Sequence, residues 1–110
     1  MKINVLGTDY EIAFRSKEED EFMKKSGCDG YCDKSAKLIV VTTDNEELSD
    51  FEYYQKKILR HEIIHAFMFE SGLDCNWQHA EQWGHDETHI DWFAIQAPKL
   101  FEAFKIADAM

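Results

Sequence analysis

The chain has 110 residues, of which 45% are hydrophobic, so it is long enough for one compact domain with a modest core. Its formal net charge is -10 at pH 7, and such a surface repels both the phosphate backbone of nucleic acids and anionic membrane surfaces. We therefore expect a single domain, residues 1–110, that binds neither nucleic acid nor a membrane directly.

The N-terminal segment and the cysteines are typical of a cytoplasmic protein. Residues 1–14 alternate polar and apolar side chains and lack the long apolar core and small-residue cleavage site of a secretory signal. No apolar run approaches the roughly 18 residues of a membrane span. Cys28, Cys32 and Cys75 form an odd set, which suits reduced thiols better than a disulfide framework. A metal pair of Cys28 and Cys32 is an alternative, although no second cysteine pair completes a tetrahedral site.

Short β-rich runs dominate the first 42 residues. Residues 2–6 and 10–14 alternate around a Leu-Gly-Thr-Asp turn and predict a hairpin. The charged stretch 16–25 predicts a short surface helix or a loop. Residues 31–33 and 37–42 predict a second hairpin, with Leu-Ile-Val-Val at 38–41 as its best-buried part. We expect these four strands to form a small antiparallel sheet.

Two helices are predicted in the second half of the chain. Ser49 and Glu52 have the spacing of a capping box, and apolar residues at helical intervals follow until Gly72, which predicts one long helix. A second apolar stripe begins at about Asp86 and predicts another helix, which Pro98 should kink or restart. The expected fold is therefore α+β, with the sheet packed on the long helix and the C-terminal helix behind it.

A His-Glu-Ile-Ile-His sequence at 61–65 lies inside the predicted long helix. The spacing of four residues brings the His61 and His65 imidazoles onto one face, where they suit two ligands of one zinc ion. Zinc lowers the pKa of a bound water, and Glu62 is placed to act as the general base that accepts its proton. In the alternative interpretation, both histidines sit at the core boundary and bond to neighbouring groups.

A catalytic zinc ion needs a third protein ligand besides two histidines. The residues that follow the long helix offer several imidazoles and carboxylates. They are His79, Glu81, His85, Asp86, Glu87, His89 and Asp91. A third ligand on a second helix packed against the first would close the site.

The sequence Leu-Arg-His-Glu-Ile-Ile-His-Ala at 59–66, followed by Glu-Thr-His-Ile-Asp-Trp-Phe-Ala at 87–94, resembles the ImmA/IrrE-type zinc peptidases, a family common in phages and mobile elements. The resemblance implies a minimal zincin-like fold in which Glu87 joins His61 and His65 as the third zinc ligand. It also implies cleavage of a regulatory protein, such as a phage or mobile-element repressor.

Several site assignments stay open from sequence. His85 or His89 could be the third ligand instead of Glu87, in a three-histidine arrangement. His89 and Tyr54 are candidates for stabilising the oxyanion of the reaction. Asp91 could fix the tautomer of His61 or His65, or it could be a solvated carboxylate on a helix face.

Two functions are compatible with these residues. A peptidase would bind a protein or peptide substrate, and the exposed edge strand at 31–33 or 37–42 could hold it as an added strand. The alternative is a non-catalytic zinc-containing binding module or anti-repressor. Glu62 favours the peptidase, because a purely structural zinc site needs no carboxylate beside its water.

Overall fold

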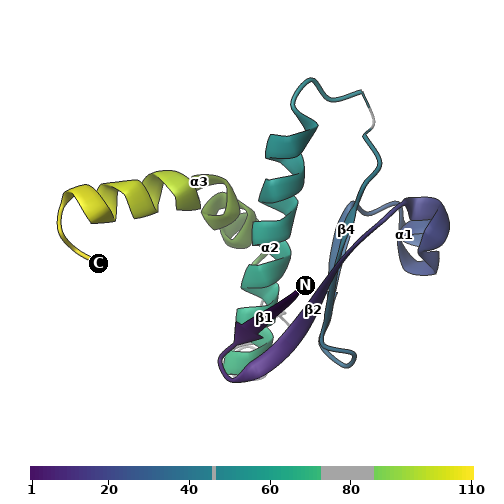
Figure 1. Cartoon of the computed structure of the whole chain (residues 1–110), viewed down its shortest axis with the longest axis horizontal. Helices are drawn as coiled ribbons and strands as arrows, with labels where there is room; N and C mark the ends of the chain where they lie inside the picture. Colours follow the sequence, from purple (N-terminus) through teal and green to yellow (C-terminus); the bar gives the residue numbers. More distant parts are fainter. Residues whose placement is uncertain (46, 73–85) are drawn as a thin grey trace.

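A computed structural model describes residues 1–45, 47–72 and 86–110 of the chain. Four strands form one sheet: β1 (Lys2–Val5), β2 (Thr8–Arg15), β3 (Gly30–Asp33) and β4 (Leu38–Thr42). A 3-10 turn, η1 (Lys17–Glu19), and a short helix, α1 (Glu21–Ser26), connect β2 to β3. Two long helices follow, α2 (Phe51–Ser71) and α3 (Glu87–Ile106). The predicted α+β class is confirmed, with the sheet packed on α2 and α3 behind it (Figure 1).

The sheet has the order β1-β2-β4-β3 and is mixed. Both predicted hairpins are present as antiparallel pairs, but β2 and β4 pair in parallel, with Ile12 opposite Ile39. The prediction of an antiparallel sheet throughout was therefore wrong at this central pair. Strand β4 lies between β2 and β3, parallel to β2 and antiparallel to β3, so β3 runs opposite to β2. This order leaves β3 at one edge.

The core lies between the sheet and α2. Alternate residues of the strands face the helix, as the period of two in a strand requires. The buried cluster consists of Val5, Tyr10, Ile12, Ile39, Val41 and Ala66. Each large apolar side chain removed from water here contributes about 1.5–3 kcal/mol. This packing fixes the face of α2 that carries Glu62 and His65, both of which are also buried.

Local hydrogen bonds define the ends of α2. The N-cap is Asp50, whose carboxylate accepts from the Tyr53 N–H at 3.1 Å, so the predicted cap at Ser49 was one residue early. With Phe51 as the first helical residue, the short Asp50 side chain reaches a free N–H of the first turn. Gly72 ends the helix with φ 82°, a left-handed conformation that glycine adopts readily.

Helix α3 continues through Pro98 rather than restarting after it. Pro98 has no N–H, so the Ala94 carbonyl lacks its usual donor one turn along the helix. The Arg60 Nε of α2 donates to this carbonyl at 2.5 Å and replaces the missing bond. Beyond Pro98 the helix leaves the body of the protein, as the yellow segment of Figure 1 shows. Within the described residues, no helix has the length and apolar character that a membrane crossing requires.

Candidate metal centre

Two histidines of α2 and one glutamate of α3 meet at the junction of these helices. His61 and His65 are one helical turn apart, and their ring centroids are 4.9 Å from each other. Glu87 is the first residue of α3, and Asp86 caps that helix by accepting from the N–H groups of Thr88 and His89. The cap therefore fixes the start of α3 beside the two imidazoles. The three side chains form a group that could hold a metal ion.

The distances between the two imidazole nitrogens and the Glu87 carboxylate suit one tetrahedral ion. His61 Nε2 lies 3.2 Å from His65 Nε2, and the Glu87 oxygens lie 3.2 Å from His61 Nε2 and 2.9 Å from His65 Nε2. Ligands at 2.0–2.1 Å from a tetrahedral zinc ion are about 3.3 Å apart. The donor set of two imidazoles and one carboxylate also occurs in catalytic zinc sites, which keep a fourth position open. By spacing and by chemistry, the three residues fit a zinc ion.

The second nitrogen of His61 has a carboxylate partner. His61 Nδ1 lies 3.2 Å from Asp91 Oδ1, and Lys57 Nζ lies 3.1 Å from the same oxygen. Asp91 is one turn after Glu87 on α3, so it faces α2 as one of the two sequence interpretations expected. Burial by itself would raise the pKa of Asp91, but Lys57 and His61 outweigh it and lower the pKa. Asp91 is therefore an anion that holds Nδ1 in its protonated form.

His61 has a carboxylate beside each ring nitrogen, with Asp91 at Nδ1 and Glu87 at Nε2. A neutral imidazole donates through only one of its nitrogens. A metal ion between Nε2 and Glu87 would leave Nδ1 as the donor. Neutral His61 then donates through Nδ1 and offers the lone pair of Nε2 to the ion.

Glu62 is close to the candidate metal ligands and is only 8% exposed. Burial, together with the negative charge of Glu87, raises the pKa of Glu62 to about 8, and Lys57 acts in the opposite direction. A divalent cation bound nearby would also lower this pKa. The protonation state of Glu62 therefore depends on the charge at the candidate metal centre.

A cleft of about 310 Å³ borders the centre. Its lining includes the three candidate ligands, Glu62, and Gly30, Tyr31 and Cys32 of the edge strand β3. Glycine is needed at position 30, because a Cβ there would lie 2.7 Å from Ile58 Cγ2 and 3.0 Å from the Val40 carbonyl oxygen. Sequence analysis did not find this role, since a glycine beside a turn gives no signal of a close approach to a distant helix.

The cysteines in the described part of the chain are free thiols, as the sequence predicted. Cys28 Sγ contacts the Ser26 hydroxyl at 3.0 Å. Burial, together with nearby carboxylates, first among them Glu62, raises the pKa of Cys32 to about 12. Among the described residues, the cysteines belong to no group that could hold a metal ion. Cys75 lies outside those residues.

Other residues singled out in the sequence lie apart from the three ligand atoms or beyond the described structure. His89 is 83% exposed, and its Nδ1 lies 2.5 Å from Asp86 Oδ2. The Tyr54 hydroxyl donates to Asp29, and Lys57 lies over its ring. Neither residue lines the cleft beside Glu62. The remaining candidates, His79, Glu81 and His85, lie outside the described residues.

Comparisons with known proteins add no family to this description. The chain matches no family model, no curated protein and no solved structure. The conclusion at this level is an α+β chain with a His/His/Glu group that could hold a metal ion on α2 and α3.

Proposed function

We propose that the chain is a zinc metallopeptidase of the ImmA/IrrE type, with His61, His65 and Glu87 as zinc ligands and Glu62 as general base. The observation that carries the proposal is that the two imidazoles lie 3.2 Å apart at Nε2 and each lies within 3.2 Å of a Glu87 oxygen, at a cleft that Glu62 also lines. The contact between Asp91 and His61 Nδ1 adds support, because metal-binding histidines usually donate their other N–H to such a partner.

The chemistry follows from the position of Glu62. A bound zinc ion would lower the pKa of water at its open position and polarise the carbonyl of a peptide bond. Glu62 accepts the proton of the attacking water and then passes it to the leaving amine. The same carboxylate serves both steps, because the proton that it takes from the water is the proton that leaves with the amine.

The edge position of β3 supports an extended peptide as substrate. A peptide that pairs with the free edge of β3 would lie along the cleft, with its backbone beside Glu62 and the candidate ligands. The negative charge of the chain favours substrates with basic residues. By its resemblance to the ImmA/IrrE type, the target is a regulatory protein such as a phage or mobile-element repressor.

Peptide hydrolysis by zinc-loaded protein tests the proposal. A library of unstructured basic peptides is incubated with wild type and with Glu62→Gln, and products are identified by mass spectrometry. We expect cleavage by wild type and a loss of at least about a hundredfold in Glu62→Gln, with zinc still bound. Equal turnover by both proteins would remove Glu62 as base. Zinc binding without any cleavage would favour the non-catalytic binding module.

A further inference from the structure

The edge strand β3 carries two residues whose backbone groups point away from the sheet. The Thr42 N–H donates to the Asp29 carbonyl at 2.8 Å, so these two opposite residues form a hydrogen-bonded pair at the start of β3. In an antiparallel ladder, such pairs alternate with pairs whose N–H and C=O groups point outward. Gly30 and Cys32 are therefore the residues whose backbone groups face the edge. Among the described residues, no strand pairs with this edge.

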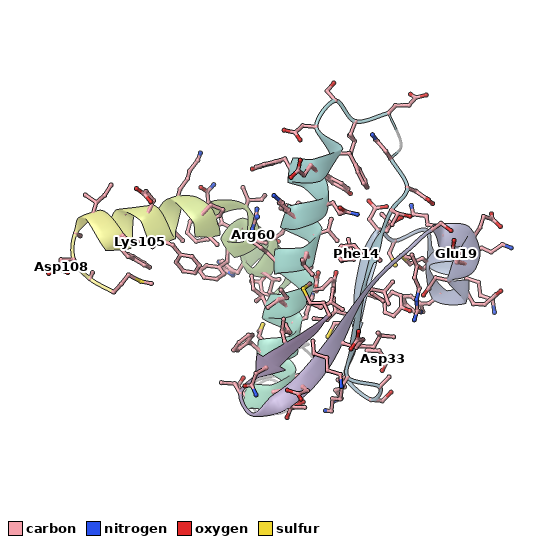
Figure 2. The ribbon with its side chains drawn as sticks, viewed as in Figure 1. Phe14, Glu19, Asp33, Arg60, Lys105 and Asp108 are labelled. Carbon is pink, nitrogen blue, oxygen red and sulfur yellow. The ribbon has the colours of Figure 1, made fainter. Side chains whose placement is uncertain are left out.

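A peptide strand paired with Gly30 and Cys32 would have side chains on both faces of the sheet, because alternate residues of a strand point to opposite faces. Cys32 packs on the core cluster between the sheet and α2, whereas the centroid of the Tyr31 ring lies 4.8 Å from that of Phe22 on α1. Figure 1 shows α1 on the side of the sheet opposite α2, and Figure 2 shows Asp33, which shares the face of Tyr31, on the side of α1. Every second residue of the peptide would thus face α2 and the candidate ligands, and the residues between them would face Phe22 and Tyr31.

A second cavity, of about 370 Å³, continues the cleft at the candidate metal centre along this edge. The cleft and the cavity have four lining residues in common, which are Phe22, Tyr31, Cys32 and Phe69. Asp33 and Lys34 also line the cavity. We call it the aromatic cavity, since the rings of Phe22, Tyr31 and Phe69 line it. A peptide bound in the cleft along β3 would therefore extend into the aromatic cavity.

The polar groups around the aromatic cavity already have partners within the chain. The Tyr31 hydroxyl donates to Asp20 at 2.7 Å. The Asp33 carboxylate accepts from the hydroxyl and N–H groups of the turn that follows β3. The Lys34 ammonium lies over the Phe69 ring, 5.4 Å from its centroid. The cavity therefore requires no charge or hydrogen-bonding group from an incoming side chain, and its walls favour another aromatic ring, because contacts between rings add to the gain from burial alone.

Asp20 holds two of the aromatic walls in place before a peptide binds. Its carboxylate is only 3% exposed, and one oxygen accepts from the Tyr31 hydroxyl while the other caps α1 by accepting from the Met23 N–H at 2.9 Å. One buried side chain thus joins β3 to the start of α1, where Phe22 lies. Rings that are already in place lose little conformational freedom when a peptide binds.

We propose that the aromatic cavity is a specificity subsite that takes a phenylalanine, tyrosine or tryptophan side chain of the substrate, close to the scissile bond. The inference rests on the proposed peptidase function, because the cavity adjoins the centre at which the bond would be cleaved. Phe22 is 56% exposed, so contact with a substrate ring removes apolar surface from water on both molecules. Phe22 and Tyr31 determine the preferred residue and take no part in the chemistry.

Matched peptides and variants of Phe22 test the subsite. A basic peptide that wild type cleaves is made with phenylalanine and with alanine at each position around the cleaved bond, and kcat/KM is measured for every pair. At one position we expect phenylalanine to be favoured by about tenfold or more, and Phe22→Ala to bring this ratio to about one while the alanine peptide is still cleaved. Phe22→Tyr keeps a ring and should keep the ratio. Tyr53→Ala is the matched control, because Tyr53 is also 56% exposed but lines neither the cleft nor the aromatic cavity.

The outcomes separate the subsite from the peptidase. Cleavage without a preference for the aromatic residue, or a preference that Phe22→Ala leaves unchanged, overturns the subsite and leaves the peptidase intact. An equal loss for both peptides in Phe22→Ala overturns the subsite too, since it indicates a structural role. If no peptide is cleaved, the peptidase proposal fails, and binding of the same peptides, labelled with fluorescein, to zinc-loaded wild type is measured by fluorescence anisotropy. Tighter binding of a phenylalanine peptide that Phe22→Ala abolishes supports the subsite, whereas equal binding or none overturns it.

Discussion

Replacement of Gly30 by alanine tests how β3 and α2 position the cleft. The new Cβ would lie 2.7 Å from Ile58 Cγ2, closer than real Cβ atoms approach, and 3.0 Å from the Val40 carbonyl oxygen, which is a tight contact. Either β3 or α2 must then move by several tenths of an ångström. Overpacking of this kind costs about 1–3 kcal/mol, which lowers the melting temperature by roughly 4–12 °C for a chain of this size. Glu62 Cγ lies 3.5 Å from the same position, so the shift reaches the proposed base.

Thermal unfolding, zinc content and peptide hydrolysis are measured for Gly30→Ala, Ile58→Ala and the double variant. We expect Gly30→Ala to keep its zinc, because the ligands lie on α2 and α3, and to lose turnover. Ile58→Ala removes the methyl group that the new Cβ would strike, so the double variant should be more stable than the sum of the two single effects predicts. Additive destabilisation, or an unchanged melting temperature in Gly30→Ala, would refute the reasoning.

Three other predictions follow from side-chain contacts and burial in the structure. Asp91→Asn should weaken zinc binding about ten- to a hundredfold, measured by competition with a chelator, because His61 loses the anion that holds its tautomer. Cys32 should resist alkylation at pH 8, measured by peptide mass spectrometry, because its pKa of about 12 keeps the thiol protonated. Burial would raise the pKa of Asp20, but hydrogen bonds from Tyr31 and other donors outweigh it and lower the pKa. The stability from Asp20 is therefore present above the ordinary aspartate pKa and lost as pH falls through the lowered value, so Asp20→Asn should flatten the acid unfolding curve.

The sequence predicted the elements of the site well because its patterns there are local. A helical apolar repeat around His61 and His65, and a second repeat after Asp86, placed the two long helices, and β-rich runs in the first 42 residues placed the four strands. The prediction that Glu87 joins the two histidines came from the resemblance to the ImmA/IrrE-type peptidases, not from the helical apolar repeats. In the structure these groups meet across the junction of α2 and α3.

The features that the sequence did not reveal depend on contacts between distant segments. The parallel pairing of β2 and β4 joins two strands that η1, α1 and β3 separate in the sequence, and no pattern within a strand encodes which distant strand becomes its neighbour. The contact of Arg60 with the Ala94 carbonyl arises because Pro98 frees that carbonyl on another helix. Gly30 is required by the approach of Ile58, 28 positions along the chain. In each example, the role depends on packing between segments that are far apart in the sequence.

Metal content tests the central claim most directly. Wild type, Glu87→Ala and His89→Ala are purified, reconstituted with zinc, freed of excess metal and analysed by plasma mass spectrometry. The two variants are neighbours on the first turn of α3, but only Glu87 contacts His61 and His65, whereas His89 is 83% exposed. We predict one zinc ion per chain in wild type and in His89→Ala, and loss of most of it in Glu87→Ala. Zinc absent from wild type, or retained in full by Glu87→Ala, would contradict the account.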